Sequence, residues 1–124
     1  MDLTVGLLEA PATETLDVEI VERKGLGHPD SICDALAEEF SLALSRFYRD
    51  RFGRILHHNV DKALLWGGSA RPRFGGGQVD RPLELFMAGR ATSSFEGVEI
   101  PVQDLLAESA ENWLGRNIHG LDPE

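Results

Sequence analysis

The stretch GLGHPDSICD places two glycines, a histidine and an aspartate at the point where an apolar helical pattern begins. His28 precedes Pro29, which suits the first position of a helix, and Asp30 falls in the first turn. The first backbone N–H groups of a helix lack intrahelical partners and form a partial positive pole that suits phosphate. Gly25 and Gly27 are expected to allow close backbone approach and unusual dihedral angles. These residue types indicate an anion site at a helix N-terminus.

A carboxylate beside a phosphate is repulsive unless a cation lies between them. Mg²⁺ is typically held by one or two carboxylates together with phosphate oxygens, so Asp30 is a candidate Mg²⁺ ligand. His28 is a candidate donor to a phosphate oxygen, and its charge would help a polyphosphate to leave. A purely structural interpretation stays open, in which the helix dipole favours Asp30 and His28 caps or packs the helix.

Asp34 lies one helical turn after Asp30, on the same face of the expected helix. It is either a further carboxylate of the site or an exposed helix residue.

The stretch HHNVDK, residues 57–62, is the second unusual group of polar side chains. Adjacent histidines on a strand face opposite sides, so His57 and His58 cannot bind one metal ion without a bulge. Asn59 and Asp61 share a face. This pair at a strand end either positions a ligand or simply marks a turn.

The elements that must position these residues follow from the spacing of apolar side chains. Alternation over 16–24 predicts a half-buried strand, and steps of three and four predict amphipathic helices over 29–52 and 101–118. Residues 1–15 show no clear period and are expected to be irregular. Further strand material is expected at 55–60 and 62–68, as one bulged strand or two short ones, at 83–92, and in the short FEGVEI stretch.

Short connections between the middle strands favour antiparallel pairing. The predicted fold is therefore α+β, with a mixed, mainly antiparallel sheet and two amphipathic helices packed on one face. A single α+β domain is expected over residues 16–124, after the irregular segment 1–15.

The composition narrows the class of protein. The net charge of −9 argues against a nucleic-acid-binding surface, because phosphate contact needs a basic patch. No stretch approaches the apolar length of a membrane helix, and the single cysteine, Cys33, excludes an internal disulfide. We therefore expect a cytoplasmic protein with no membrane partner. A local anion site stays open at two groups of arginines: Arg46, Arg49, Arg51 and Arg54, and Arg71, Arg73 and Arg81.

Three stretches together resemble one family. VERKGLGHPDSICDALAE, RFGRILHHNVDKALLWGGSARPRFGGG and RPLELFMAGRAT look like the N-terminal part of methionine adenosyltransferase (S-adenosylmethionine synthetase) in its archaeal-type form. The closing stretch from IPVQDLL onward resembles the segment that follows in that form. The resemblance covers the chain from about residue 16 onward.

The resemblance implies an enzyme that makes S-adenosylmethionine from ATP and L-methionine, with release and hydrolysis of tripolyphosphate. It implies Mg²⁺, commonly K⁺, and a homo-oligomer whose active sites lie between subunits. Carried over, His28 matches a phosphate-contacting histidine of catalytic importance, with Gly27 beside it in the nucleotide site. Asp30 matches an Mg²⁺-binding aspartate, and Asn59 and Asp61 lie where the family places substrate- or ion-facing groups.

The same resemblance implies that the chain covers only about the first third of such an enzyme. Lysines and acidic residues that clamp the tripolyphosphate and a second Mg²⁺ are expected from later segments. We therefore predict that this polypeptide is not active alone and that it exposes apolar sheet surface. The alternative is a non-catalytic nucleotide-binding or assembly module that keeps the family fold.

Overall fold

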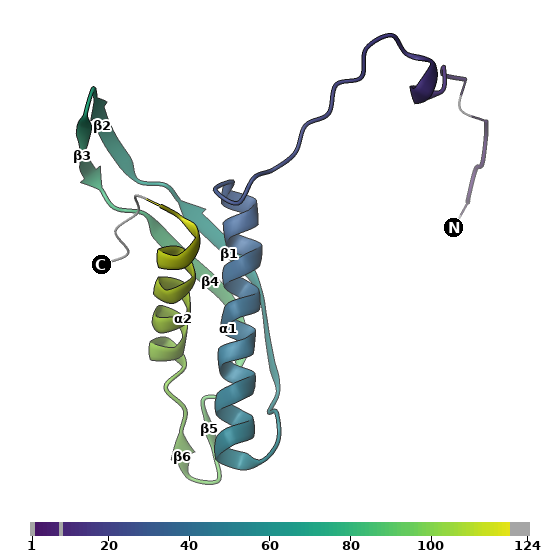
Figure 1. Cartoon of the computed structure of the whole chain (residues 1–124). Coiled ribbons are helices and arrows are strands. Elements are labelled where there is room, and N and C mark those ends of the chain that lie inside the picture. The colour runs from purple at the N-terminus through teal and green to yellow at the C-terminus, as the bar shows by residue number, and fades with distance from the viewer. Residues whose placement is uncertain (1, 8, 120–124) are drawn as a thin grey trace.

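A computed structural model describes residues 2–7 and 9–119 of the chain. A long extended N-terminal segment leads into a body of two helices and a two-stranded sheet, and a hairpin projects from that sheet (Figure 1). The elements in chain order are η1 (Thr13–Thr15), α1 (Pro29–Phe52), β1 (His58–Trp66), β2 (Ser69–Arg73), β3 (Gly76–Arg81), β4 (Glu84–Ala91), β5 (Ser94–Phe95), β6 (Val98–Glu99) and α2 (Val102–Asn117).

Helix α1 forms where the sequence predicts it, with Pro29 at its first position and Gly53 at its end. Gly53 has a φ of 72°, the left-handed conformation that glycine adopts without steric cost. The helix buries one apolar residue per turn against the body: Ile32, Leu36, Phe40, Leu44 and Tyr48. This spacing of four is why a single stripe of α1 faces the core.

The described strands form three antiparallel pairs, β1 with β4, β2 with β3 and β5 with β6. The β1–β4 pair is the sheet of the body, and β1 is one strand with an irregularity between Asn59 and Lys62. The sequence left open one bulged strand or two short ones, and the first alternative is confirmed.

The two helices lie side by side on one face of the β1–β4 pair (Figure 1). At one end Trp113 and Leu114 of α2 pack with α1 and with Leu65 and Leu85 of the sheet. At the other end the α1 stripe packs with Val60 and Ile100. Met87 on β4 contacts both clusters and joins them. The α+β class and the placement of both helices on one face are confirmed.

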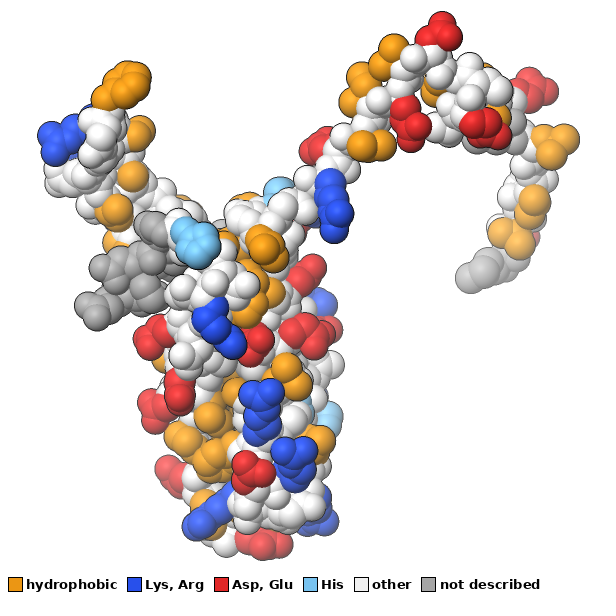
Figure 2. All heavy atoms as spheres, viewed as in Figure 1, with side chains coloured by type: hydrophobic (Ala, Val, Ile, Leu, Met, Phe, Trp, Pro, Cys, Tyr) orange, Lys and Arg blue, Asp and Glu red, His pale blue; other side chains and the backbone are white. Residues whose placement is uncertain are grey.

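The predicted strand over 16–24 is wrong for this structure. Residues 16–24 belong to no helix or strand, and each of them is exposed. Ile20 is 90% exposed, and apolar and acidic side chains alternate openly along the segment (Figure 2). The alternation is present in the sequence, but no strand of the described chain pairs with it.

The hairpin β2–β3 forms from a stretch rich in glycine and proline. All its strand residues are exposed, and Phe74 stands at the tip between the strands. On the body, Phe86 is exposed on the sheet face away from the helices, as is Leu64 opposite it. Apolar sheet surface is therefore exposed, as predicted. Within residues 2–7 and 9–119, no helix has the length and apolar character to cross a membrane.

Candidate functional site

The start of α1 carries the histidine and aspartate that the sequence singles out. His28 is the N-cap residue, and its Nδ1 accepts a hydrogen bond of 3.1 Å from the backbone N–H of Asp30. A nitrogen that accepts carries no proton, so in the neutral ring the proton lies on Nε2. His28 and Asp30 are both exposed. The helix thus fixes His28 with a donor, Nε2–H, free for a ligand.

Lys24 provides a partner that sequence reasoning missed. Its Nζ forms an ion pair with Oδ2 of Asp30. The hydrogen bond and charge of Lys24 lower the pKa of Asp30, and Asp30 in turn raises the pKa of Lys24. A shallow groove of about 300 Å³ beside the helix start is lined by Arg23, Lys24, Gly25, Leu26 and Ser31. Two cationic side chains and a helix N-terminus therefore meet there, which suits an anion.

The glycines before the helix behave differently from the expectation. Neither Gly25 nor Gly27 has a positive φ, so the prediction of unusual dihedral angles there is wrong. A Cβ added at either position would meet no atom of the described chain within 4 Å. The turn itself closes with a 3.1 Å hydrogen bond from His28 N–H to the Gly25 carbonyl. Glycine here leaves open space beside the backbone.

A second polar group lies along the side of α1. Asn59 and Asp61 of β1 line a groove of about 500 Å³ together with Asp34 and Glu38 of α1. Asp34 is exposed and lies one turn beyond Asp30. The structure thus brings Asn59, Asp61 and Asp34 to one groove, while His28 and Asp30 lie at the helix start and line no part of it.

The irregularity in β1 decides how these side chains point. Asn59 pairs with Arg90 and Lys62 with Ala88, so β1 has one residue more than β4 between the two pairs. A bulge of this kind redirects side chains. It brings the β1 backbone onto Gly89, where an added Cβ would lie 2.2 Å from the Asn59 carbonyl oxygen and 2.9 Å from Val60 Cα. Gly89 therefore permits the bulge.

The two adjacent histidines diverge, as their strand positions predict. His57 is exposed, whereas His58 points to α1, with its Nε2 3.0 Å from the Ser41 hydroxyl. Its Nδ1 lies 3.0 Å from the Leu56 carbonyl oxygen. This serine–histidine contact joins two elements through residues that are 17 positions apart in the chain. Among residues 2–7 and 9–119 no three His, Cys, Asp or Glu side chains are placed to hold a metal ion by themselves.

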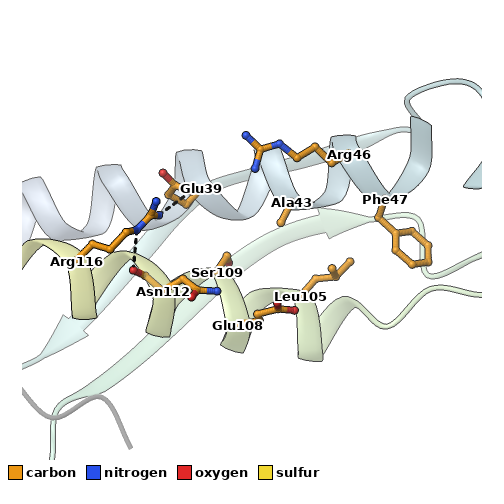
Figure 3. A pocket seen from close by; sticks show the side chains of 9 residues that line it. All are labelled: Glu39, Ala43, Arg46, Phe47, Leu105, Glu108, Ser109, Asn112 and Arg116. Carbon is orange, nitrogen blue, oxygen red and sulfur yellow. Dashed lines mark hydrogen bonds and ion pairs between the residues drawn. The ribbon is translucent and has the colours of Figure 1, made fainter. Parts of the chain in front are cut away.

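Another groove, of about 460 Å³, runs between α1 and α2 and contains none of His28, Asp30, Asn59 and Asp61 (Figure 3). Arg116 of α2 approaches Glu39 of α1 at 3.9 Å and donates to the Asn112 carbonyl at 2.9 Å. Arg46 and Glu108 also line it. The groove is lined by side chains of both charges, and the Arg116–Glu39 ion pair spans it from α2 to α1.

The sequence was compared with known proteins. The sequence model of the S-adenosylmethionine synthetase (AdoMet synthetase) family matches residues 1–124. The chain belongs to this family. It is 60% identical over 108 residues to a probable S-adenosylmethionine synthase of Aquifex aeolicus, covering 87% of this chain and 27% of that protein.

Two further S-adenosylmethionine synthases show the same relation. The protein of Aeropyrum pernix is 52% identical over 118 residues, covering 92% of this chain and 29% of its own length. The protein of Saccharolobus islandicus is 52% identical over 127 residues, and the match covers 99% of this chain and 31% of that protein. The chain thus spans about three tenths of the length of the synthases it matches.

Proposed function

We propose that this chain is part of a methionine adenosyltransferase and supplies one side of its tripolyphosphate site. The observation that carries the proposal is the start of α1. His28 is exposed and is held by the helix cap with its proton on Nε2, and the same helix start borders the groove lined by Arg23 and Lys24. Membership of the synthetase family and the activity for which its relatives are named support the same function.

In this reaction the nucleophile belongs to the substrate. The sulfur of L-methionine forms a bond to C5′ of the ATP ribose, and the C5′–O bond breaks with its electron pair leaving on the tripolyphosphate. Water then hydrolyses the tripolyphosphate. The task of the protein is to position the reactants and to stabilise the charge on the leaving group. His28 would donate to a phosphate oxygen, and open space at Gly27 would admit the phosphates near the backbone.

Asp30 is the residue of this group that would hold Mg²⁺. Its lowered pKa keeps the carboxylate ionised, and one carboxylate combined with phosphate oxygens is a usual Mg²⁺ donor set. Bound there, Mg²⁺ would offset the negative charge of the phosphates. Lys24 would have to exchange partners, from Asp30 to a phosphate.

The remaining parts of the proposal rest on the family alone. They are K⁺ as a further cation, a role for Asn59 and Asp61 toward substrate or ion, and cytoplasmic location. A homo-oligomer with active sites between subunits belongs with them, and the exposed sheet face at Leu64 and Phe86 is the apolar surface such an assembly would cover. The second candidate is a non-catalytic nucleotide-binding or assembly module that keeps the family fold.

The test uses the full-length protein and measures S-adenosylmethionine formation and ATP binding with and without Mg²⁺. Asp30→Asn is expected to abolish the Mg²⁺ dependence of ATP binding, and His28→Ala to lower turnover at least about a hundredfold. Asp50→Asn, an exposed aspartate at the other end of α1, is the matched control. Unchanged metal-dependent affinity and turnover in both site variants would refute the assigned roles, and ATP binding without product formation would favour the second candidate.

A further inference from the structure

Ser41 and His58 form a hydrogen-bonded pair where the middle of α1 crosses the beginning of β1. The Leu56 carbonyl oxygen can only accept, so Nδ1 of His58 carries the proton that it donates across 3.0 Å. In the neutral ring Nε2 then accepts from the Ser41 hydroxyl at 3.0 Å. The contact fixes both the tautomer and the plane of the ring.

Two further neighbours limit the freedom of His58. The ring of Tyr48, which is fully buried, lies 5.7 Å from the His58 ring, centroid to centroid. Ser45, one turn after Ser41 on the same side of α1, is 3.5 Å from Nε2, at the limit of a hydrogen bond. The Ser41 hydroxyl is therefore the one that holds the His58 ring. Ser45 lies in a similar position on α1 but makes at most a marginal hydrogen bond to the ring.

The pair stands immediately before the bulge. Asn59 follows His58 directly, and Asp61 is the second residue after that, within the irregular part of β1. The strand pairs with β4 on both sides of the bulge, through His58 and Asn59 before it and from Lys62 onward after it. The direction of Asn59 and Asp61 therefore depends on what fixes the strand before the bulge. Two side-chain hydrogen bonds do so: the Thr92 hydroxyl donates to the His57 carbonyl oxygen at 2.9 Å, and Ser41–His58 ties the strand to α1, the helix that lines the groove from the other side.

We propose that Ser41 is a positioning residue that acts through His58 to aim Asn59 and Asp61 into the groove beside Asp34 and Glu38. Ser41 and His58 themselves line this groove, so the hydrogen bond lies in the wall that also holds Asn59 and Asp61. A small misplacement of groups that contact substrate lowers the rate steeply, up to about a hundredfold per ångström. The inference rests on the proposed function, because the loss is measured in that reaction.

The experiment uses the full-length protein with three variants: Ser41→Ala, Ser41→Thr and Ser45→Ala. Steady-state formation of S-adenosylmethionine gives kcat and KM for ATP and for methionine, and circular dichroism confirms that each variant is folded at the assay temperature. Ser41→Ala is expected to lower kcat/KM about tenfold or more while remaining folded. Ser41→Thr, which keeps a hydroxyl, is expected to recover most of the loss, and Ser45→Ala to resemble the wild type.

The outcomes separate this inference from the function on which it rests. Wild-type activity in Ser41→Ala would overturn the inference and leave the proposed function standing. So would an equal loss in Ser41→Ala and Ser45→Ala, or a loss that follows only the unfolded fraction, because either indicates a purely structural role. A full-length wild type that makes no S-adenosylmethionine would overturn the proposed function, and this inference with it.

Discussion

Residues 16–24 and 83–92 have the same kind of sequence pattern, but only the second segment forms a strand. Both alternate apolar and polar side chains, which indicates a half-buried strand. The second forms β4, which pairs with β1 and turns Leu85 and Met87 toward the helices. The first is exposed throughout and pairs with nothing in the described chain. Alternation therefore indicates only that a segment is suited to burial on one side. Whether it is buried depends on a partner strand and on a layer of side chains that covers its apolar face.

Glycine substitutions give the sharpest test of this comparison. Gly89→Ala is expected to lower the free energy of unfolding by about 3 kcal/mol, because the added Cβ has to displace the β1 backbone. Gly6→Ala, in the exposed N-terminal segment where a Cβ meets nothing, is the control and is expected to change it by less than about 0.5 kcal/mol. Urea denaturation measures both values. Equal effects would show that the bulge contact with Gly89 is absent.

Apolar truncations in the two alternating segments test the difference directly. Met87→Ala removes contacts to both core clusters and is expected to cost about 2 kcal/mol. Ile20→Ala is expected to cost less than about 0.5 kcal/mol in the chain of 124 residues, since the side chain is already 90% exposed. Thermal and urea unfolding provide the measurement. A comparable cost at Ile20 would mean that segment 16–24 is covered after all.

The smallest expected effect concerns protonation at the helix start. Lys24 lowers the pKa of Asp30, so Lys24→Met is expected to raise that pKa toward its ordinary value. Whatever stability the pair contributes is present above the unfolded-state pKa of Asp30 and is lost as the pH falls through the lower folded-state pKa. A ¹³C NMR titration of the Asp30 carboxyl measures the shift. An identical titration in the variant and the wild type would exclude the ion pair.

The sequence predicted the parts of the fold that depend on local spacing. Buried residues recur every fourth position along α1, and Gly53 ends the helix where a left-handed residue is needed. His28 and Asp30 could be placed at the helix start for the same reason, since capping involves neighbours in sequence. The strand over 16–24 failed because pairing is not a local property.

Contacts between elements were beyond the reach of sequence patterns. Ser41 and His58 are 17 residues apart and meet only because α1 crosses β1 at that level. The Lys24–Asp30 pair depends on the turn between them, whose shape no periodicity describes. Asn59 and Asp61 both line the groove beside α1, and the bulge in this part of β1 was one of two open alternatives.

If Asp30 binds Mg²⁺ as proposed, the Lys24–Asp30 pair lets the helix start exchange one cation for another. A cation that binds Asp30 takes the place of an ammonium group already there, so no bare carboxylate has to be created first. Because both partners are exposed, the contact given up is weak. The displaced ammonium remains tethered within a few residues and becomes a counterion for whatever anion arrives with the cation. Under that proposal a divalent cation and a polyanion would bind together, the cation replacing Lys24 at Asp30 and the anion replacing Asp30 at Lys24.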